Sequence, residues 1–285
     1  MMAPDSPRAL VGDLVQLDRD HPGFRDAGYR ARRNHIAALA LAHQEGESAP
    51  IVPYTEEEHA VWRTVWNELS PVWHRHACSQ FLDALPRFDA FRTRIPQLVD
   101  VNRVVKQHTG FELTPVAGLV SPAKFMRALG KKTFLSTQYI RHASRPLYTP
   151  EPDVVHEVLG HAVSLTQPDF ATWNALFGRA SQSVDEAAQE PLIRAYWYTL
   201  EFGLWREGRA LKAPGAGLLS SFGELGQVET TPRLEPFDLD VIAKTPFDPT
   251  EYQKVLFVAD SPAHFNDALH AWVERFVRNA GVVRE

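Results

Sequence analysis

Apolar residues recur every three to four positions along much of the chain, which is the period of helices that bury one face. Between these stretches lie polar segments with proline, glycine or serine, which favour turns. Only short runs have the β-branched and aromatic character of strands. Helices are predicted over residues 27–45, 55–69, 95–108, 122–129, 168–178 and 263–278, and short strands over residues 116–120, 134–142 and 256–258. The pattern therefore predicts a mainly helical chain.

Several helix boundaries carry their own signals. Thr55 is followed three residues later by Glu58, the pattern of a capping box in which each side chain bonds the backbone N–H of the other residue. Pro71 is expected to end this helix and to start another, because proline suits the first turn and disrupts the interior. Residues 1–18 are weakly patterned and predict a flexible tail, so the folded domain would span residues 19–285.

Composition limits the classes of function. The chain has 285 residues, 44% of them hydrophobic, which is enough to bury a large core. Its formal net charge of −5 gives no electrostatic reason to bind nucleic acid or an anionic membrane. Cys78 is the single cysteine, which excludes an internal disulfide and fits a reducing compartment. We recognise no secretion signal or membrane-spanning run, so a cytoplasmic location is expected.

A short segment in the middle of the chain has the residue types of a metal site. Asp153 is expected to cap a helix that carries His156, Glu157 and His161, and histidine is the commonest metal ligand. The two histidines are five positions apart, about 140° around a regular helix, whereas zinc proteases place them four apart on one face. Both can reach one ion only where the helix is distorted, and Gly160 offers a place for that.

A third ligand must come from elsewhere in the chain. Glu201 is the single charge in the aromatic run of residues 196–205, and a buried carboxylate without a partner is costly. Two histidines and one carboxylate on one face of a non-haem iron leave three positions open for oxygen and substrate. A zinc-dependent hydrolase with Glu157 as general base is the alternative from another class.

These residues stand among segments that resemble a known family, the tetrahydropterin-dependent aromatic amino acid hydroxylases. The resemblance runs from about Asp20 to Val258, and its motifs follow in the order and approximate spacing of the family. They are DHPGF, IPQLVDV, PVAGL, TQYIRH, YTPEPD, HEVLGH, EFGL and GAGLLSSFGEL. The resemblance implies a single-domain basket of helices, with a few short strands, around a deep pocket that holds iron.

The resemblance also implies roles for individual residues. His156, His161 and Glu201 would bind Fe(II), with Glu157 beside them in the catalytic site. Arg141 would bind the substrate carboxylate, with which a guanidinium pairs bidentately. The other implied substrate-binding residues are Thr149, Pro152, Trp197, Phe202 and Ser220. A tetrahydropterin, either tetrahydrobiopterin or a bacterial analogue, would stack on Phe125 near Gly118, Val120 and Glu157.

Some positions depart from the family pattern. Pro122 and Leu135 stand where animal members tend to place polar residues near the pterin, which leaves the identity of the pterin open. His161 is followed by Ala162 and Val163 rather than by the usual sequence with proline. The regulatory domain and the tetramer-forming tail of larger members are not recognised, which predicts a bacterial-type monomer.

The activity that the resemblance implies is hydroxylation of an aromatic amino acid with O₂. Trp197 is bulky where members that act on tryptophan tend to carry a smaller ring, so phenylalanine or tyrosine is favoured. Short members of this kind are mostly phenylalanine hydroxylases, and phenylalanine 4-monooxygenase is therefore the predicted activity. Tyrosine or tryptophan hydroxylation is the alternative within the family. Residues 247–249 lie where the choice between phenylalanine and tyrosine is partly set. A non-catalytic pterin- or amino-acid-binding protein is a further alternative, against which the complete set of three ligands argues.

Overall fold

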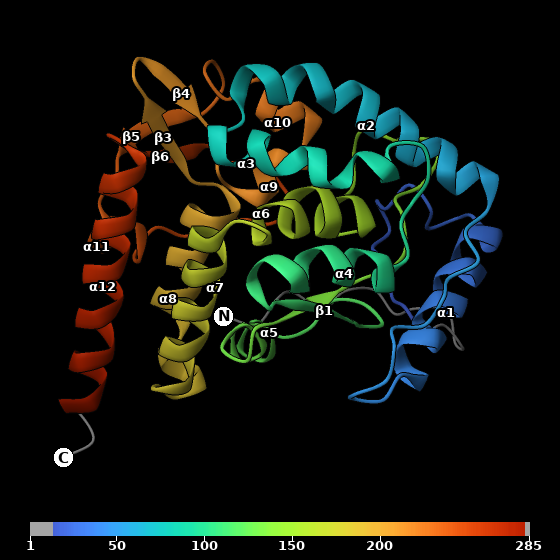
Figure 1. Cartoon of the computed structure of the whole chain (residues 1–285), viewed down its shortest axis with the longest axis horizontal. Coiled ribbons are helices and arrows are strands. Elements are labelled where there is room, and N and C mark those ends of the chain that lie inside the picture. The colour runs from blue at the N-terminus through green and yellow to red at the C-terminus, as the bar shows by residue number, and fades with distance from the viewer. Residues whose placement is uncertain (1–13, 283–285) are drawn as a thin grey trace.

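Helices form most of the chain that the structure, a computed structural model, describes (Figure 1). The described residues are 14–282, with side chains for residues 14–280. The α-helices are α1 (Ala27–Ala42), α2 (Glu56–His76), α3 (Ser79–Ala84), α4 (Leu98–Thr109), α5 (Pro122–Leu129), α6 (Val163–Leu165), α7 (Pro168–Gln182), α8 (Glu190–Tyr196), α9 (Ala216–Leu219), α10 (Phe222–Gly226), α11 (Leu239–Ile242) and α12 (Pro262–Val282). The 3₁₀ segments are η1 (Leu85–Phe91) and η3 (Glu186–Ala188), and the π-helices are η2 (His156–Ala162) and η4 (Trp197–Glu201). Within residues 14–282, no helix has both the length and the apolar run needed to cross a membrane.

The strands are short and form two small sheets. They are β1 (Glu112–Pro115), β2 (Thr133–Ser136), β3 (Leu204–Glu207), β4 (Ala210–Lys212), β5 (Arg233–Pro236) and β6 (Val255–Ala259). β1 and β2 pair in parallel, and the other sheet has the order β4-β3-β6-β5, in which only the β3–β4 pair is antiparallel. Because η4 ends just before β3 begins, this sheet anchors the segment that carries Glu201.

Helix α2 runs across the top of Figure 1 and is longer than the sequence predicts. The capping box at Thr55 is confirmed, with both reciprocal bonds present. The prediction that Pro71 starts a new helix is wrong, because α2 continues through it to His76. The N–H that proline lacks would bond the carbonyl of Asn67, and Asn67 lies on the exposed face, where water can bond that carbonyl.

The inner face of α2 belongs to the large hydrophobic core of the molecule. Trp62, Trp66 and Trp73 follow one another along it, are almost fully buried and contact each other. The indole N–H of Trp73 also donates to the carbonyl of Leu219 at 2.7 Å. Since Leu219 is the last residue of α9, this bond joins α2 to the short helix that packs on η2.

Three other predictions change in the structure. The strand predicted over residues 116–120 is wrong, because those residues form a loop and the strand is β1, which ends at Pro115. The strand predicted over residues 134–142 is shorter in the structure, where it is β2. Its partner β1 ends at Pro115, opposite Ser136, so the residues after Ser136 have no strand to pair with there. The helix predicted over residues 95–108 begins later, at Leu98.

The predicted N-terminal tail is described only in part. Residues 1–13 lie outside the described residues, so most of the predicted tail, residues 1–18, stays untested. In the described remainder, the backbone N–H of Val15 donates to the side chain of Asn34 at 3.1 Å, and Leu17 is buried.

Candidate active site

The π-winding of η2 brings two histidines to one face. In a π-helix each backbone N–H bonds the carbonyl five residues earlier, so side chains five positions apart lie close together on one side of the helix. His156 and His161 have this spacing, and their Nε2 atoms are 3.0 Å apart. The helix distortion that the sequence predicts is therefore confirmed, but it is a change of winding and not a break at Gly160.

Gly160 instead permits close packing between η2 and α9. A Cβ atom at this position would lie 2.7 Å from the carbonyl oxygen of Ala216, closer than Cβ contacts come in real proteins. The two segments are in contact along this line. The missing side chain of Gly160 therefore allows α9 to present Ser220, the residue after its last turn, to His156.

Glu201 reaches the same point from the end of η4. One carboxylate oxygen lies 3.1 Å from Nε2 of His161, and the other lies 3.7 Å from Nε2 of His156. The ligand atoms of the three residues all fall within 4.8 Å of one another. Two imidazole nitrogens and one carboxylate are the donor set of a non-haem iron site, so these residues fit Fe(II).

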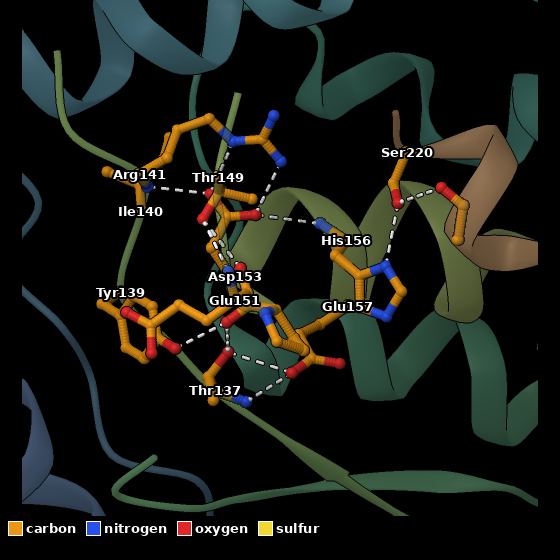
Figure 2. Close-up of polar contacts among 12 residues, drawn as sticks. Thr137, Tyr139, Ile140, Arg141, Thr149, Glu151, Asp153, His156, Glu157 and Ser220 are labelled. Carbon is orange, nitrogen blue, oxygen red and sulfur yellow. Dashed lines mark hydrogen bonds and ion pairs between the residues drawn. The ribbon is translucent and has the colours of Figure 1, made fainter. Parts of the chain in front are cut away.

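Ser220 fixes the tautomer of His156 (Figure 2). Its Oγ lies 2.8 Å from Nδ1 of His156 and donates to the carbonyl of Ala216 at 2.9 Å. A hydroxyl has one hydrogen, and with that hydrogen on the carbonyl of Ala216, Nδ1 carries the proton that it donates to Ser220. Nε2 then keeps its lone pair toward Glu201, as a metal ligand requires.

Burial and neighbouring charges set the charge states of these ligands. Burial lowers the pKa of His156 to about 4, and the adjacent His161 adds to this effect. Burial alone would raise the pKa of Glu201. The nearby His161, and to a lesser extent His156, lower it by more than burial raises it, so the pKa of Glu201 lies below its usual value. At neutral pH His156 is neutral and Glu201 is ionised, which are the forms that bind a metal ion.

A mostly apolar cavity of about 300 Å³ opens beside the three ligands. Phe134 contacts the ring of His161, with centroids 4.4 Å apart, and meets Phe125 edge-on at 5.3 Å. The volume lies in the range of small-ligand sites. Besides the ligands and Phe134, the lining includes Val116, Gly118, Leu119, Val120, Pro122, Phe125, Met126, Leu135, Thr137, Pro152, Glu157, Ile193, Tyr196, Trp197, Phe247 and Pro249.

Comparison with protein families places this chain in a known group. The model of the biopterin-dependent aromatic amino acid hydroxylases matches residues 9–284. The chain belongs to this hydroxylase family. The resemblance and the mainly helical fold that the sequence predicts are thereby confirmed.

The hydroxylases that the chain resembles act on more than one amino acid. Tyrosine 3-monooxygenase of Bos taurus is 44% identical over 267 residues, covering 92% of this chain and 54% of that protein. Phenylalanine-4-hydroxylase of Mus musculus is 45% identical over 259 residues, covering 89% of this chain and 56% of that protein. The chain thus spans about half the length of these curated relatives.

Among solved structures, bacterial phenylalanine hydroxylases share the fold. The Chromobacterium violaceum enzyme with bound oxidized Fe(III) has a TM-score of 0.77 at 29% identity, covering 87% of this chain and 92% of that one. The Legionella pneumophila enzyme has a TM-score of 0.75 at 29% identity, covering 83% and 95%. The family is biopterin-dependent, and the C. violaceum enzyme has also been solved with cobalt.

In this member of the family, most of the predicted site residues face the cavity and four do not. Those that line it are Gly118, Val120, Phe125, Pro152, His156, Glu157, His161, Trp197 and Glu201. Those that do not line it are Arg141, Thr149, Phe202 and Ser220. Phe202 packs on Trp197 with ring centroids 4.7 Å apart, and the Thr149 hydroxyl donates to the carbonyl of Glu151 at 2.7 Å.

Arg141 is held by a carboxylate whose role the sequence did not reveal (Figure 2). Its Nε and Nη2 donate to the two oxygens of Asp153, each at 2.8 Å, and both side chains are buried. Burial would raise the pKa of Asp153, but the charge and hydrogen bonds of Arg141 hold it below its usual value. Asp153 also accepts from the backbone N–H of His156 at 3.2 Å, which confirms it as a cap of the metal-site helix. The one carboxylate thus orients the guanidinium and the first metal ligand together.

Glu157 lines the cavity, but it is not one of the three residues whose ligand atoms come together. One of its oxygens accepts from the backbone N–H of Thr137 at 3.1 Å and from the hydroxyl of Thr137 at 3.0 Å (Figure 2). Burial raises the pKa of Glu157 to about 7. It can therefore change charge near neutral pH at the edge of the pocket.

Part of the aromatic lining was missed from the sequence. Phe134 faces His161, Tyr196 meets Phe125 edge-on at 5.6 Å, and Phe247 stacks flat on Trp197 at 4.2 Å. The aromatic run before Glu201 was the available signal for Tyr196. Phe247 belongs to residues 247–249, which the resemblance had connected with substrate choice, although its stacking on Trp197 could not be predicted. The contact of Phe134 with His161 has no local sequence signal.

Proposed function

We propose that this protein hydroxylates L-phenylalanine to L-tyrosine with O₂ and a tetrahydropterin at a non-haem Fe(II) site. The observation that carries the proposal is the convergence of His156, His161 and Glu201 beside an apolar cavity of about 300 Å³. When bound, the iron and the pterin supply the redox chemistry that amino acid side chains lack. The chain holds the ligands, orients the substrates and limits the access of water.

The residues around the cavity suit these tasks. We propose that Arg141, oriented by Asp153, binds the substrate carboxylate near Thr149 and Ser220. Pro152 and Trp197, backed by Phe202, would flank the substrate ring. Phe125, with Gly118, Val120 and Glu157, would hold the pterin, because all four line the cavity and Phe125 offers an aromatic face for stacking.

Two observations support phenylalanine as the substrate. The bacterial structures that share the fold are phenylalanine hydroxylases. Trp197 and Phe247 form a flat double layer of rings in the cavity wall, which leaves less room for an indole ring than for a benzene ring. Tyrosine is the second candidate, because tyrosine 3-monooxygenases are as similar in sequence as the phenylalanine hydroxylases.

A substrate panel tests the proposal. Purified protein with measured iron content is given phenylalanine, tyrosine or tryptophan with a tetrahydropterin, while oxygen uptake and hydroxylated product are followed. We expect about one iron per chain and the fastest turnover on phenylalanine. Iron-loaded protein that consumes no oxygen with any of the three would contradict the hydroxylase activity. Peptidase activity with bound zinc would instead support the hydrolase alternative.

The predicted monomeric state and cytoplasmic location are part of the proposal. Light scattering after size-exclusion chromatography should give a mass near 32.1 kDa. Fractionation of the source cells should recover the protein with soluble cytoplasmic enzymes. A dimer or larger species at micromolar concentration would contradict the first expectation.

A further inference from the structure

Gln253 lies behind the aromatic wall of the cavity and bonds it at several points. Its Oε1 accepts from the indole N–H of Trp197 at 3.0 Å. Its Nε2 donates to the carbonyls of Asp248 and Glu251, each at 3.0 Å. One acceptor and two donors are what a side-chain amide offers, so these partners fix its orientation. Gln253 is also buried, at 8% exposure, where unmade bonds of this kind are expensive.

The amide ties together the two rings that form the wall. Trp197 is packed between Phe202, with centroids 4.7 Å apart, and Phe247, with centroids 4.2 Å apart and planes 12° from parallel. Phe247 belongs to the segment of residues 247–253, whose turn is closed by the bonds from Gln253. Trp197 is therefore held by two ring contacts and by the hydrogen bond that its indole N–H donates to Gln253.

The same segment is attached to the rest of the fold beside this point. The backbone N–H of Gln253 donates to the carboxylate of Glu224 in α10 at 2.9 Å. Phe247 and Pro249, earlier in the segment, line the cavity. The backbone of Gln253 is thus held by Glu224, and its side chain in turn holds Trp197 and the turn of residues 248–251.

We propose that Gln253 is a positioning residue that sets the width of the ring-binding part of the cavity and so the choice among aromatic amino acids. The inference rests on the proposed hydroxylase function. Gln253 touches neither the metal ligands nor the cavity in this structure, and it acts through Trp197 and Phe247. Without its bonds the indole of Trp197 can turn and residues 247–249 can shift, which admits a wider ring and holds a narrow one less firmly.

The test uses Gln253→Met, which keeps the length of the side chain but not its hydrogen bonds. The matched control is Gln97→Met. Gln97 makes two amide bonds with the backbone of Val52, both 2.9 Å, and is not part of the cavity lining. The iron-loaded proteins are compared for kcat/KM on phenylalanine and on tryptophan, for the KM of the pterin, and for thermal stabilisation by phenylalanine without pterin.

We expect Gln253→Met to lower the phenylalanine-to-tryptophan ratio of kcat/KM by roughly tenfold, the scale of discrimination by apolar pockets. Its KM for phenylalanine should rise, its stabilisation by phenylalanine should shrink, and its KM for the pterin should stay within about twofold of the parent value. Gln97→Met should lower the melting temperature without changing the ratio. In a Trp197→Phe background, which lacks the indole N–H, Gln253→Met should change the ratio less than it does alone, because the two residues act as a pair.

Two outcomes separate this inference from the proposed function. If the parent protein turns over no aromatic amino acid, the proposed function is overturned. If the parent is active and folded Gln253→Met keeps the parent ratio, only the role of Gln253 is overturned. Should Gln253→Met not fold, Gln253→Asn replaces it, since its amide is one methylene too short to reach all three partners, and an unchanged ratio in that variant overturns the role equally.

Discussion

The two sides of the cavity are built in different ways. The metal side takes its ligands from η2 and η4, two π-helices in which the winding of the backbone itself aims the side chains. The aromatic side depends on Gln253, which bonds Trp197 from 56 residues away in the sequence. The geometry of the candidate ligands is thus set mainly within two short segments, whereas the aromatic wall is held by contacts between distant ones. It follows that a substitution on one side should leave the property of the other side largely intact.

The largest expected effect comes from removing the anionic ligand. Glu201→Ala leaves two imidazoles and no anionic ligand, which should hold Fe(II) too weakly for stable loading, so iron content and hydroxylation should both fall to background. Metal analysis and product formation measure this. Glu229→Ala, which removes an exposed glutamate, should keep both. Stoichiometric iron in Glu201→Ala would show that the ligand set is different.

The next effect concerns stability and pH. Burial raises the pKa of Glu157 to about 7 from its usual 4.5, so between these values the folded state keeps a proton that the unfolded state has released. The metal-free protein should therefore lose stability as the pH rises through this range. Glu157→Gln keeps an acceptor for Thr137 and should be more stable than the parent by up to about 3 kcal/mol at pH 8, with no such advantage at pH 4. Denaturant unfolding of both proteins at the two pH values is the measurement, and a difference that does not depend on pH would contradict it.

A smaller effect is expected from the residue that fixes the histidine tautomer. Ser220→Ala removes the acceptor for Nδ1 of His156, which should weaken iron binding by about 10–100-fold, as is typical for partners of metal-bound histidines. Competition against a chelator gives the affinity. Ser221→Ala is the neighbouring control, because that side chain caps α10 and does not contact His156. Equal iron affinity in Ser220→Ala and Ser221→Ala would show that Ser220 does not contribute to iron binding.

The smallest effect lies on the aromatic side. Trp197→Phe makes room in the wall and should raise the relative turnover of tryptophan several-fold, which corresponds to about 1 kcal/mol of discrimination. Iron content should stay at the parent level. Competition between phenylalanine and tryptophan in one reaction measures the ratio. Loss of iron in this variant would show that the two sides are not independent.

The sequence was most informative where function depends on residue type and spacing. His156, His161 and Glu201 were identified because few other roles suit two nearby histidines and one carboxylate in an aromatic run. Even so, their five-residue spacing required a distortion whose form, π-winding, no propensity could predict. The apolar period located α5 to the residue and α12 to within a few residues at each end.

The sequence was least informative where a residue depends on a distant partner. Pro71 carries a strong local signal for a helix boundary, but the tertiary packing of Trp66 and Trp73 on either side keeps α2 continuous. Asp153 has the local signal of a helix cap, whereas its pairing with Arg141 depends on how the chain folds back. Gln253 stands in an ordinary polar segment, and only the structure shows that its amide faces Trp197.

The bond from Trp73 to Leu219 links the outer helix α2 to the metal side. Leu219 precedes Ser220, which bonds His156, so two hydrogen bonds joined by one peptide bond connect the C-terminal turn of α2 to His156. Trp73 is fully buried in the core, so Ser220 keeps its place beside His156 only while this part of the core stays packed. On gradual heating we therefore expect iron to leave the protein together with the cooperative melting of its helices, and release at a clearly lower temperature would show that the metal side opens independently.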